Sequence, residues 1–462
     1  MSGAELAERV LARAGRGGEL LVIVDETATA HLRWAGNTLT TSGAARRRRL
    51  TVVALADAGS GTAAGVVGSG GAPTDRDLAE LVARARHTAR AGEPAQDAAP
   101  LAVATGLPAA SWDDPAAEVP VHRLHGFSAG LGDAFAAARA AGHDLYGYAE
   151  QRVDTTWLAS TGGLRLRHVQ PTSVLDLTAR GGGTASAWAG VGGTDLTYTD
   201  LPATAVRLRD RLAGVPRRDT LAPGRYEVLL PPACVADLML HLYLNAGAAD
   251  ALDGRTVFGG ADGGTRIGER LTASPLTLRS DPAAPGLACA PFLVARASGS
   301  AGSVFDNGLP LAATRWMVDG QLRALVQTRH SARRAGQPFT PFVDNLVLAG
   351  PAGGRTLADM VAGTRRGLLL TCLWYLRDVD PRTLLLTGLT RDGVYLVEDG
   401  EVVAALPNFR FNESPVALLG RVTEVGATER TLPREWGDYF TRMAMPTLRV
   451  ADFAVSEVSP AV

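Results

Sequence analysis

The 462-residue chain contains no lysine, so all 46 of its basic residues are arginine. With 47 acidic residues the formal net charge is only −1, and this balance gives no overall field that would attract nucleic acid. The one dense basic run, residues 46–49, leads into an apolar, strand-like segment, and we interpret it as the solvated start of a strand. We therefore expect no nucleic-acid partner. The absence of lysine indicates the coding bias of a GC-rich genome rather than a mechanism.

Cysteine is also scarce. Cys234, Cys289 and Cys372 lie far apart in apolar surroundings, and the chain has no CxxC pair. An odd count without paired spacing argues against a disulfide framework and against a zinc knuckle. We expect three reduced, buried thiols.

Long hydrophobic runs are missing as well. No stretch of eighteen or more uncharged apolar residues occurs, so we expect no membrane-spanning segment. The first residues mix Glu5 and Glu8 with Arg9 and Arg13, which is typical of a short amphipathic helix rather than of a signal peptide. We therefore expect a cytoplasmic protein with no membrane partner.

The chain does have enough apolar residues, 46%, to form two or three domains that each have a core. Hydrophobic periodicity divides it near the proline- and glycine-containing segment 212–224. Before this break it predicts strands at 20–27, 31–43, 50–68, 147–158 and 164–177, helices starting at Thr74 and covering 127–141, and a loop at 93–119. After the break it predicts strands at 225–232 and 447–456, helices at 233–252 and 357–366, and turns at 306–308, 319–320, 392–393 and 399–400.

This pattern predicts an α+β fold with a mixed N-terminal α/β domain, residues 1–215, followed by a β-rich C-terminal domain, residues 216–462. One helix, residues 233–252, is embedded among the C-terminal strands. Its centre, LMLHLYLNAG, holds His241 in an apolar segment.

Three segments partly match catalytic or binding motifs, but each lacks a feature that the motif requires. The glycine-rich segment 58–65 does not open a helix, so we interpret it as a hairpin turn rather than a phosphate-binding loop. The segment GFSAG, residues 126–130, has the spacing of a nucleophile elbow, but a short polar segment precedes it where a hydrophobic strand is required. A helical zinc site needs a second histidine and a glutamate base; here Leu242 follows His241, and Asn245 and Ala246 come four and five residues after it. By itself, His241 is expected to be a core histidine.

The chain as a whole resembles the TldD/PmbA (TldE) family of bacterial peptidases and modulators. The N-terminal half does so through HLRWAGNTLTTSG and LTVVALAD with its glycine turn. The C-terminal half does so through VFDNGLPLAATRWMVDGQLRALVQTRHSARRAG, the asparagine of VDNLVLAG, and GVYLVEDGEVVAALPNFRFNESPVALLGRVTEVG.

The resemblance implies a two-domain subunit that works in pairs. In the TldD branch an HExxxH helix and a downstream cysteine bind the metal, and the glutamate acts as the base. The TldE branch lacks this set and completes a heterodimer that degrades or trims unstructured peptides in an internal cavity. Carried over, His241 stands at the first histidine, Leu242 at the glutamate and Ala246 at the second histidine, and the C-terminal cysteine is absent. We expect a vestigial metal site with no catalytic or metal-binding residue in this chain, and zinc in a TldD-like partner.

Three functions remain open on this basis. The first is a non-catalytic TldE/PmbA-like subunit of a heterodimeric metallopeptidase that acts on unstructured peptides. The second is a stand-alone peptide-binding module or homodimer, for example in the maturation of a modified peptide. The third is a divergent hydrolase that uses Ser128 or Cys372 as its nucleophile.

Overall fold

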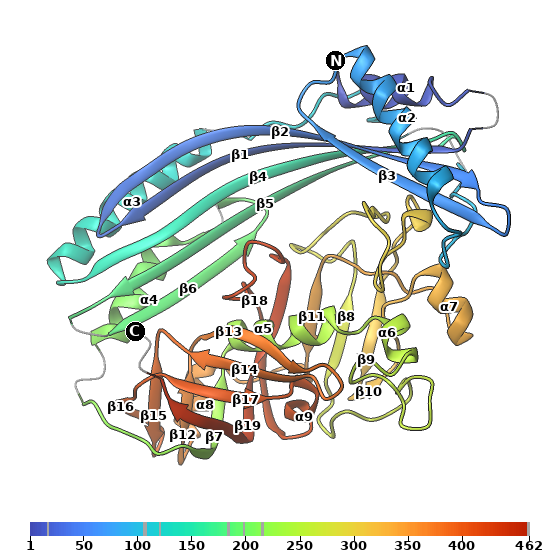
Figure 1. Ribbon diagram of the computed structural model, residues 1–462. Helices are drawn as coiled ribbons and strands as arrows, with labels where there is room; N and C mark the ends of the chain where they lie inside the picture. Colours follow the sequence, from blue (N-terminus) through green and yellow to red (C-terminus); the bar gives the residue numbers. More distant parts are fainter. Residues whose placement is uncertain are drawn as a thin grey trace.

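The N-terminal half of the computed structural model is a long, curved antiparallel sheet with helices on one face (Figure 1). The structure describes residues 1–15, 18–104, 109–119, 122–182, 185–196, 199–213 and 217–459, with only the backbone of 122–125. Within these ranges the sheet has six strands in the order β3-β2-β1-β4-β5-β6. The strands are β1 Leu20–Ala35, β2 Thr38–Asp57, β3 Thr62–Gly70, β4 Asp144–Ser160, β5 Arg165–Arg180 and β6 Ser186–Gly193. The helices are α1 Gly3–Leu11, α2 Asp75–Ala91, α3 His122–Ala140 and α4 Leu201–Ala213.

The two faces of this sheet have different neighbours because side chains alternate along a strand. Leu20, Val22 and Val24 of β1 pack in one cluster with residues of α1 and α2, and residues near the end of β1 pack with α3 and α4. The intervening residues Leu21 and Ile23 instead pack against the C-terminal half. The alternation therefore gives the sheet a helix-covered face and a face that looks toward the second half of the chain.

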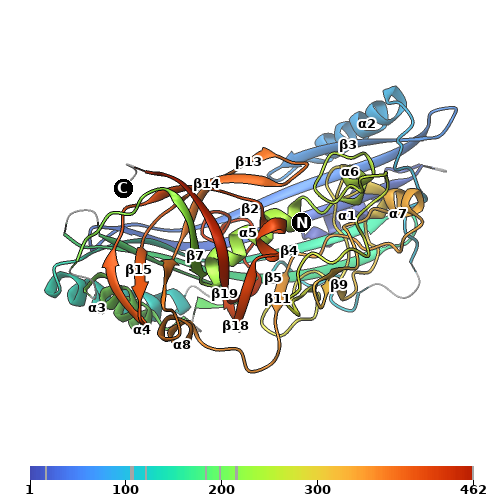
Figure 2. The same cartoon turned by 90° about the horizontal axis from the view of Figure 1, so that it is seen from below.

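The C-terminal half is built around a branched mixed sheet (Figure 2). Its main path is β10-β9-β8-β11-β19-β7-β12-β15-β16, with β13, β14, β17 and β18 attached to its side. The strands are β7 Gly224–Leu230, β8 Thr277–Ser280, β9 Thr314–Val318, β10 Gln321–Leu322, β11 Leu346–Ala349, β12 Arg366–Leu370, β13 Leu373–Asp380, β14 Leu385–Thr390, β15 Val394–Glu398, β16 Glu401–Ala405, β17 Phe409–Glu413, β18 Val422–Thr431 and β19 Met443–Val458. The helices are α5 Pro232–Leu244, α6 Ala248–Leu252, α7 Arg329–Ala335, α8 Leu357–Ala362 and α9 Pro415–Leu419, with a 3-10 turn, η2, at Val304–Asp306.

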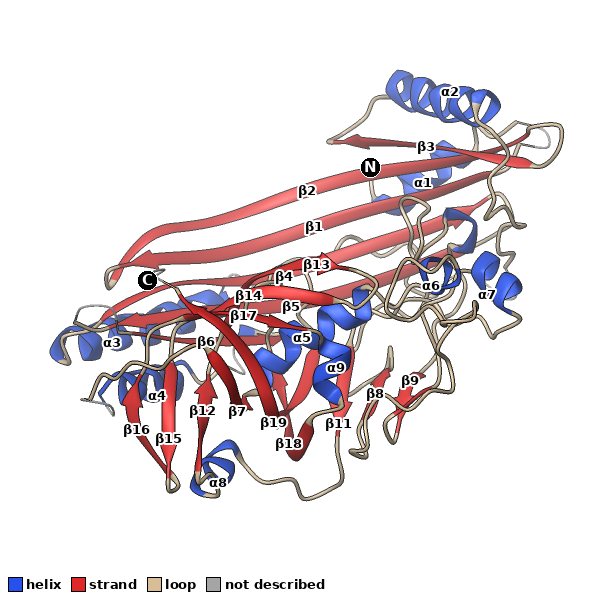
Figure 3. Cartoon of the chain, turned by 60° about the horizontal axis from the view of Figure 1, so that its bottom comes forward, coloured by secondary structure: helices blue, strands red, loops and turns tan. Residues whose placement is uncertain are grey.

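Helix α5 lies inside this half, between the strands and the N-terminal sheet (Figure 3). Every residue from Cys234 to Tyr243 is buried, so the helix is part of the core on all sides. None of the described helices is long and apolar enough to cross a membrane.

Several predicted elements need correction. The predicted strand at 31–43 is a hairpin, because Gly36 and Asn37 have positive φ angles of 57° and 58° and turn β1 into β2. Residues 46–49 therefore lie in the interior of β2 rather than at its start. The predicted turn at 306–308 begins at the last residue of the 3-10 turn η2 and joins no paired strands of the described structure. The turn at 392–393 joins β14 to β15, which do not pair with each other. Helix α8 ends at Ala362, and β12 starts within the range predicted as helix.

The predicted helix 233–252 is also wrong in its extent, because it is divided into α5 and α6. Asn245 caps the end of α5, and its side-chain amide donates to the carbonyl of His241 at 3.0 Å. Gly247 then forms the N-cap of α6. The predicted domain boundary between 215 and 216 lies outside the described residues.

Candidate functional site

His241, the histidine at the first position of the predicted vestigial metal site, is buried near the end of α5. Pro231 stands at the N-cap and Pro232 begins the helix, where a proline costs no hydrogen bond. His241 is 6% exposed. Its Nδ1 lies 3.5 Å from a carboxylate oxygen of Asp378, and the indole N–H of Trp436 donates to its Nε2 at 3.4 Å.

Burial lowers the pKa of His241, against the opposing effect of the Asp378 carboxylate. A neutral imidazole that accepts from Trp436 at Nε2 carries its proton on Nδ1, and that N–H faces Asp378. Trp436 also packs edge-on against the imidazole, with ring centroids 6.1 Å apart. Both nitrogens of His241 are therefore engaged by protein groups.

The other two positions carried over from the family supply only hydrocarbon. Leu242 is 4% exposed and packs with Phe258 and Trp316 in the core. Ala246 lies beyond the last residue of α5, and its carbonyl accepts from the backbone N–H of Val326 at 2.8 Å. Among the described residues, no group of three histidine, cysteine, aspartate or glutamate side chains could hold a metal ion. A three-ligand zinc site of the TldD kind does not fit these residues.

One turn before His241, Asp237 fixes the loop that follows β18. Its two carboxylate oxygens accept the backbone N–H groups of Arg434 and Glu435, each at 3.1 Å. Burial raises the pKa of Asp237 to about 8. The Glu435 carboxylate in turn accepts the backbone N–H of Leu376 at 2.6 Å. In this chain, α5 therefore positions the loop that follows β18.

Arg434 connects this loop to the N-terminal sheet. Its guanidinium forms an ion pair with Asp176 of β5 at 2.8 Å and lies 3.7 Å from Asp392. It also lies over the rings of Trp188 and Trp374, at 5.0 Å and 4.9 Å from the ring centroids. One side chain therefore contacts elements of both halves of the molecule.

We predict that Arg434→Ala lowers the free energy of unfolding by about 2–3 kcal/mol, because it leaves a mostly buried carboxylate of Asp176 without its cation and removes both ring contacts. Arg434→Lys keeps the charge but loses the planar stacking, so an intermediate loss is expected. Urea denaturation measures both. Equal stability of Arg434→Ala and the parent chain would contradict this assignment.

A large cavity, about 790 Å³, lies between the N-terminal sheet and the C-terminal half. The strand register explains the polar side chains that the N-terminal sheet contributes to its lining. On the face that looks toward the C-terminal half, one row across four strands reads Arg49, Asp25, Thr156 and His168, and the next row reads Arg47, Thr27, Asp154 and Gln170.

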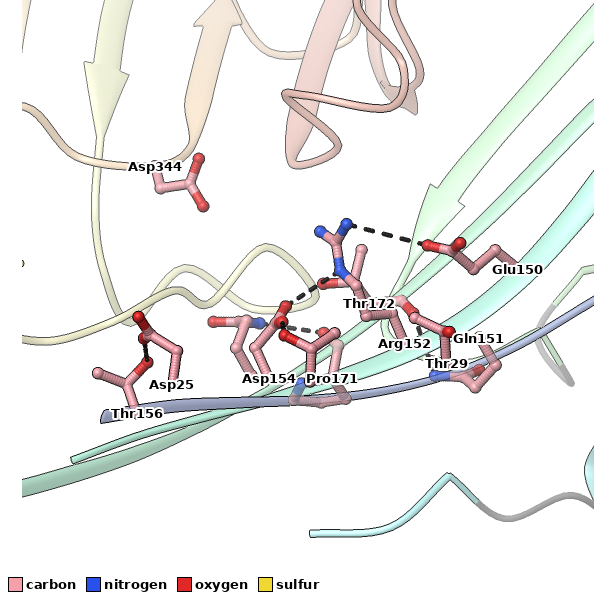
Figure 4. A network of polar contacts seen from close by, with 12 residues as sticks. Asp25, Thr29, Glu150, Gln151, Arg152, Asp154, Thr156, Pro171, Thr172 and Asp344 are labelled. Carbon is pink, nitrogen blue, oxygen red and sulfur yellow. Dashed lines mark hydrogen bonds and ion pairs between the residues drawn. The ribbon is translucent and has the colours of Figure 1, made fainter. Parts of the chain in front are cut away.

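Ion pairs hold this lining in place (Figure 4). Arg152 contacts Asp154 at 3.0 Å within β4. Across the gap between the halves, Asp25 receives two hydrogen bonds from Arg296, at 2.6 Å and 2.9 Å. Thr156 donates to the same carboxylate at 2.8 Å. Similarly, Arg442 contacts Asp344 at 2.6 Å and donates to Thr172 at 2.7 Å.

This cavity is not among the features predicted above, although the sequence contains a signal for it. Beyond Ile23 the apolar alternation of β1 gives way on one face to Asp25, Thr27 and Thr29. Comparable alternating polar residues occur in β4 and β5. Strands whose inner face turns polar partway along their length indicate a sheet that covers a polar space rather than a core.

The two candidate nucleophiles lie away from this cavity. The segment 126–130 lies within α3, so Ser128 is on an exposed helical turn rather than at the strand–turn–helix junction of a nucleophile elbow. Cys372 is buried, and burial raises the pKa of its thiol well above the ordinary value. Its Sγ donates weakly to the carbonyl of Leu373 at 3.6 Å. A thiol in this environment is poorly suited to nucleophilic attack.

A curved sheet above a β-rich domain with a buried helix defines a known class of fold. TldE from Thermococcus kodakarensis has it, with a TM-score of 0.77 at 16% identity over 98% of this chain and 99% of that chain. A protein from Thermotoga maritima described as a candidate modulator of a DNA gyrase gives 0.75 at 16% identity over 98% and 99%. A protein from Bacteroides thetaiotaomicron with a similar description gives 0.76 at 13% identity over 98% of both chains. No curated protein sequence matches.

Residues 223–457 match the PmbA/TldA metallopeptidase C-terminal domain. The chain belongs to the PmbA/TldD family of metallopeptidase-related proteins. This confirms the predicted family and the predicted α+β fold class.

Proposed function

We propose that this chain is the non-catalytic, TldE-like subunit of a heterodimeric metallopeptidase that degrades or trims unstructured peptides. The proposal depends on the side chains that α5 and the residues just after it present at the positions of the family's metal motif. Where TldD-type proteins hold a metal ligand, a base and a second ligand, this chain has His241 with both nitrogens engaged, and Leu242 and Ala246 as hydrocarbon.

Hydrolysis by a zinc-bound water needs three protein ligands to hold the metal and a base to take the proton from the water. A single imidazole next to Asp378 provides neither the ligand number nor a base at the position of Leu242. The proposal therefore assigns the metal, its ligands and the base to a TldD-like partner.

The contribution of this chain would be to hold the peptide. The cavity between the halves has charged and polar side chains among apolar ones and has room for an extended segment. In addition, β2 pairs with β3 only from Arg49 onward, so in the described structure no strand covers the outer edge of residues 38–47. Strand addition at such an edge reads main chain rather than side chains, which suits substrates of varied sequence.

Co-expression with a TldD-like protein that carries an intact HExxxH helix tests the proposal. We expect the two chains to co-purify and to cleave an unstructured peptide, while each alone does not. Cleavage by this chain alone, with zinc bound in one-to-one ratio, would overturn it. If this chain binds peptide with no dependence on a TldD-like protein, the second candidate, a stand-alone or homodimeric binding module, is favoured.

A further inference from the structure

The arginine run of residues 46–49 does not act as one patch, because strand alternation divides it between the two faces of the sheet. Arg46 forms an ion pair with Glu118 at 2.6 Å, and Arg48 one with Glu26 at 2.8 Å. These two side chains are on the helix-covered face. Arg47 and Arg49 line the cavity on the opposite face.

The charges around the cavity do not balance. Among its described lining residues, five arginines face three aspartates. Each aspartate already has an arginine partner, and these pairs are Arg296 with Asp25, Arg152 with Asp154 and Arg442 with Asp344. Arg47 and Arg49 are left over, and no described residue forms an ion pair or side-chain hydrogen bond with either.

The strand register shows why the two arginines lack a carboxylate partner. Arg49 stands directly opposite Asp25 across the β1–β2 ladder, the position from which an arginine would ordinarily pair with it. Asp25 is instead engaged by both donor groups of Arg296 from the C-terminal half, and by Thr156. Arg47 stands opposite Thr27, whose hydroxyl donates to Asp154 at 2.6 Å. The neighbouring carboxylates are therefore occupied elsewhere.

We propose that Arg47 and Arg49 bind carboxylate groups of the peptide in the cavity, so that this subunit favours acidic peptides or free C-terminal ends. This inference rests on the proposed peptide-handling function and names the chemistry that it prefers. Guanidinium groups pair with carboxylates through two parallel hydrogen bonds. Two residues apart on a strand, the arginines are about 7 Å from each other, the spacing of alternate side chains in an extended peptide.

Fluorescence anisotropy with labelled, unstructured ten-residue peptides tests the inference, using the full chain alone and with its partner. The four peptides form two pairs. In the first pair one neutral sequence has either a free or an amidated C-terminus. In the second pair the same amidated sequence carries either alternate aspartates or alternate asparagines. We expect at least one carboxylate-bearing peptide to bind about tenfold more tightly than its amide counterpart. The first pair of peptides reports on a C-terminal carboxylate and the second pair on acidic side chains.

The variants separate this site from the rest of the molecule. Arg47→Ser with Arg49→Ser should remove the preference for carboxylate, while Arg46→Ser, on the opposite face of the same strand, should keep it. Arg47→Glu with Arg49→Glu should instead favour a peptide with alternate lysines, a reversal that misfolding cannot produce.

Equal binding of carboxylate and amide peptides, or an unchanged preference in the double serine variant, would overturn the inference while leaving peptide handling intact. Failure of all four peptides to bind, with or without the partner, would overturn the inference and the proposed function together.

Discussion

In a complex with a TldD-like partner, replacement of the partner's motif glutamate by glutamine is expected to lower the peptide cleavage rate by about 10²–10⁴-fold. By contrast, His241→Ala in this chain is expected to leave the cleavage rate at the same order of magnitude. The difference follows from the chemistry of the two positions. Loss of a general base removes the proton transfer that the reaction needs. Among the described residues, the imidazole nitrogens of His241 are engaged by Asp378 and Trp436 of its own chain.

Cleavage of one unstructured peptide by the purified complexes measures this difference. Thermal unfolding of His241→Ala provides the control for a loss of structure. A large fall in the rate with His241→Ala at unchanged stability would contradict a non-catalytic role for α5.

The variant Leu242→Glu, which places a glutamate where the resemblance puts that of the family motif, is expected to destabilise the chain by about 3–5 kcal/mol rather than to create activity. Leu242 is 4% exposed among apolar side chains, so a carboxylate there would be charged without water or a partner. The matched variant Leu242→Met conserves volume and should cost less than about 1.5 kcal/mol.

Urea denaturation at several pH values tests this expectation further. Burial raises the folded-state pKa of the introduced glutamate above its unfolded value of about 4.3. The folded state then holds the proton more tightly, so the penalty is largest above the folded pKa and fades as the pH falls toward the unfolded one. A stable Leu242→Glu chain that binds zinc would show that the position is still a working site.

Much of the fold could be predicted from local patterns. The alternation of apolar residues predicted most of the strands, and the capping box at Thr74 and Asp77 marked the start of α2, with both of its hydrogen bonds present. Strands and helix caps depend on residues that are close together in the sequence, so local patterns can predict them. The family and the α+β class were predicted from the order of these elements along the chain, and both are confirmed.

The cavity could not be predicted in the same way, because its chemistry depends on register and on contacts between distant segments. Arg46 and Arg47 are neighbours in sequence, yet one pairs with Glu118 behind the sheet and the other lines the cavity. Likewise, only the structure shows that Asp25 is taken by Arg296, which lies 271 residues away. The break between α5 and α6 was also missed, although Asn245 and Gly247 are typical of a helix end and a new start.

We propose that α5 of this chain has no working metal site. The decisive measurement is the zinc content of the purified chain, taken after exposure to excess zinc and removal of loosely bound metal. We expect far less than one zinc per chain, unchanged by His241→Ala. One zinc per chain that is lost in His241→Ala would show that α5 still binds the metal.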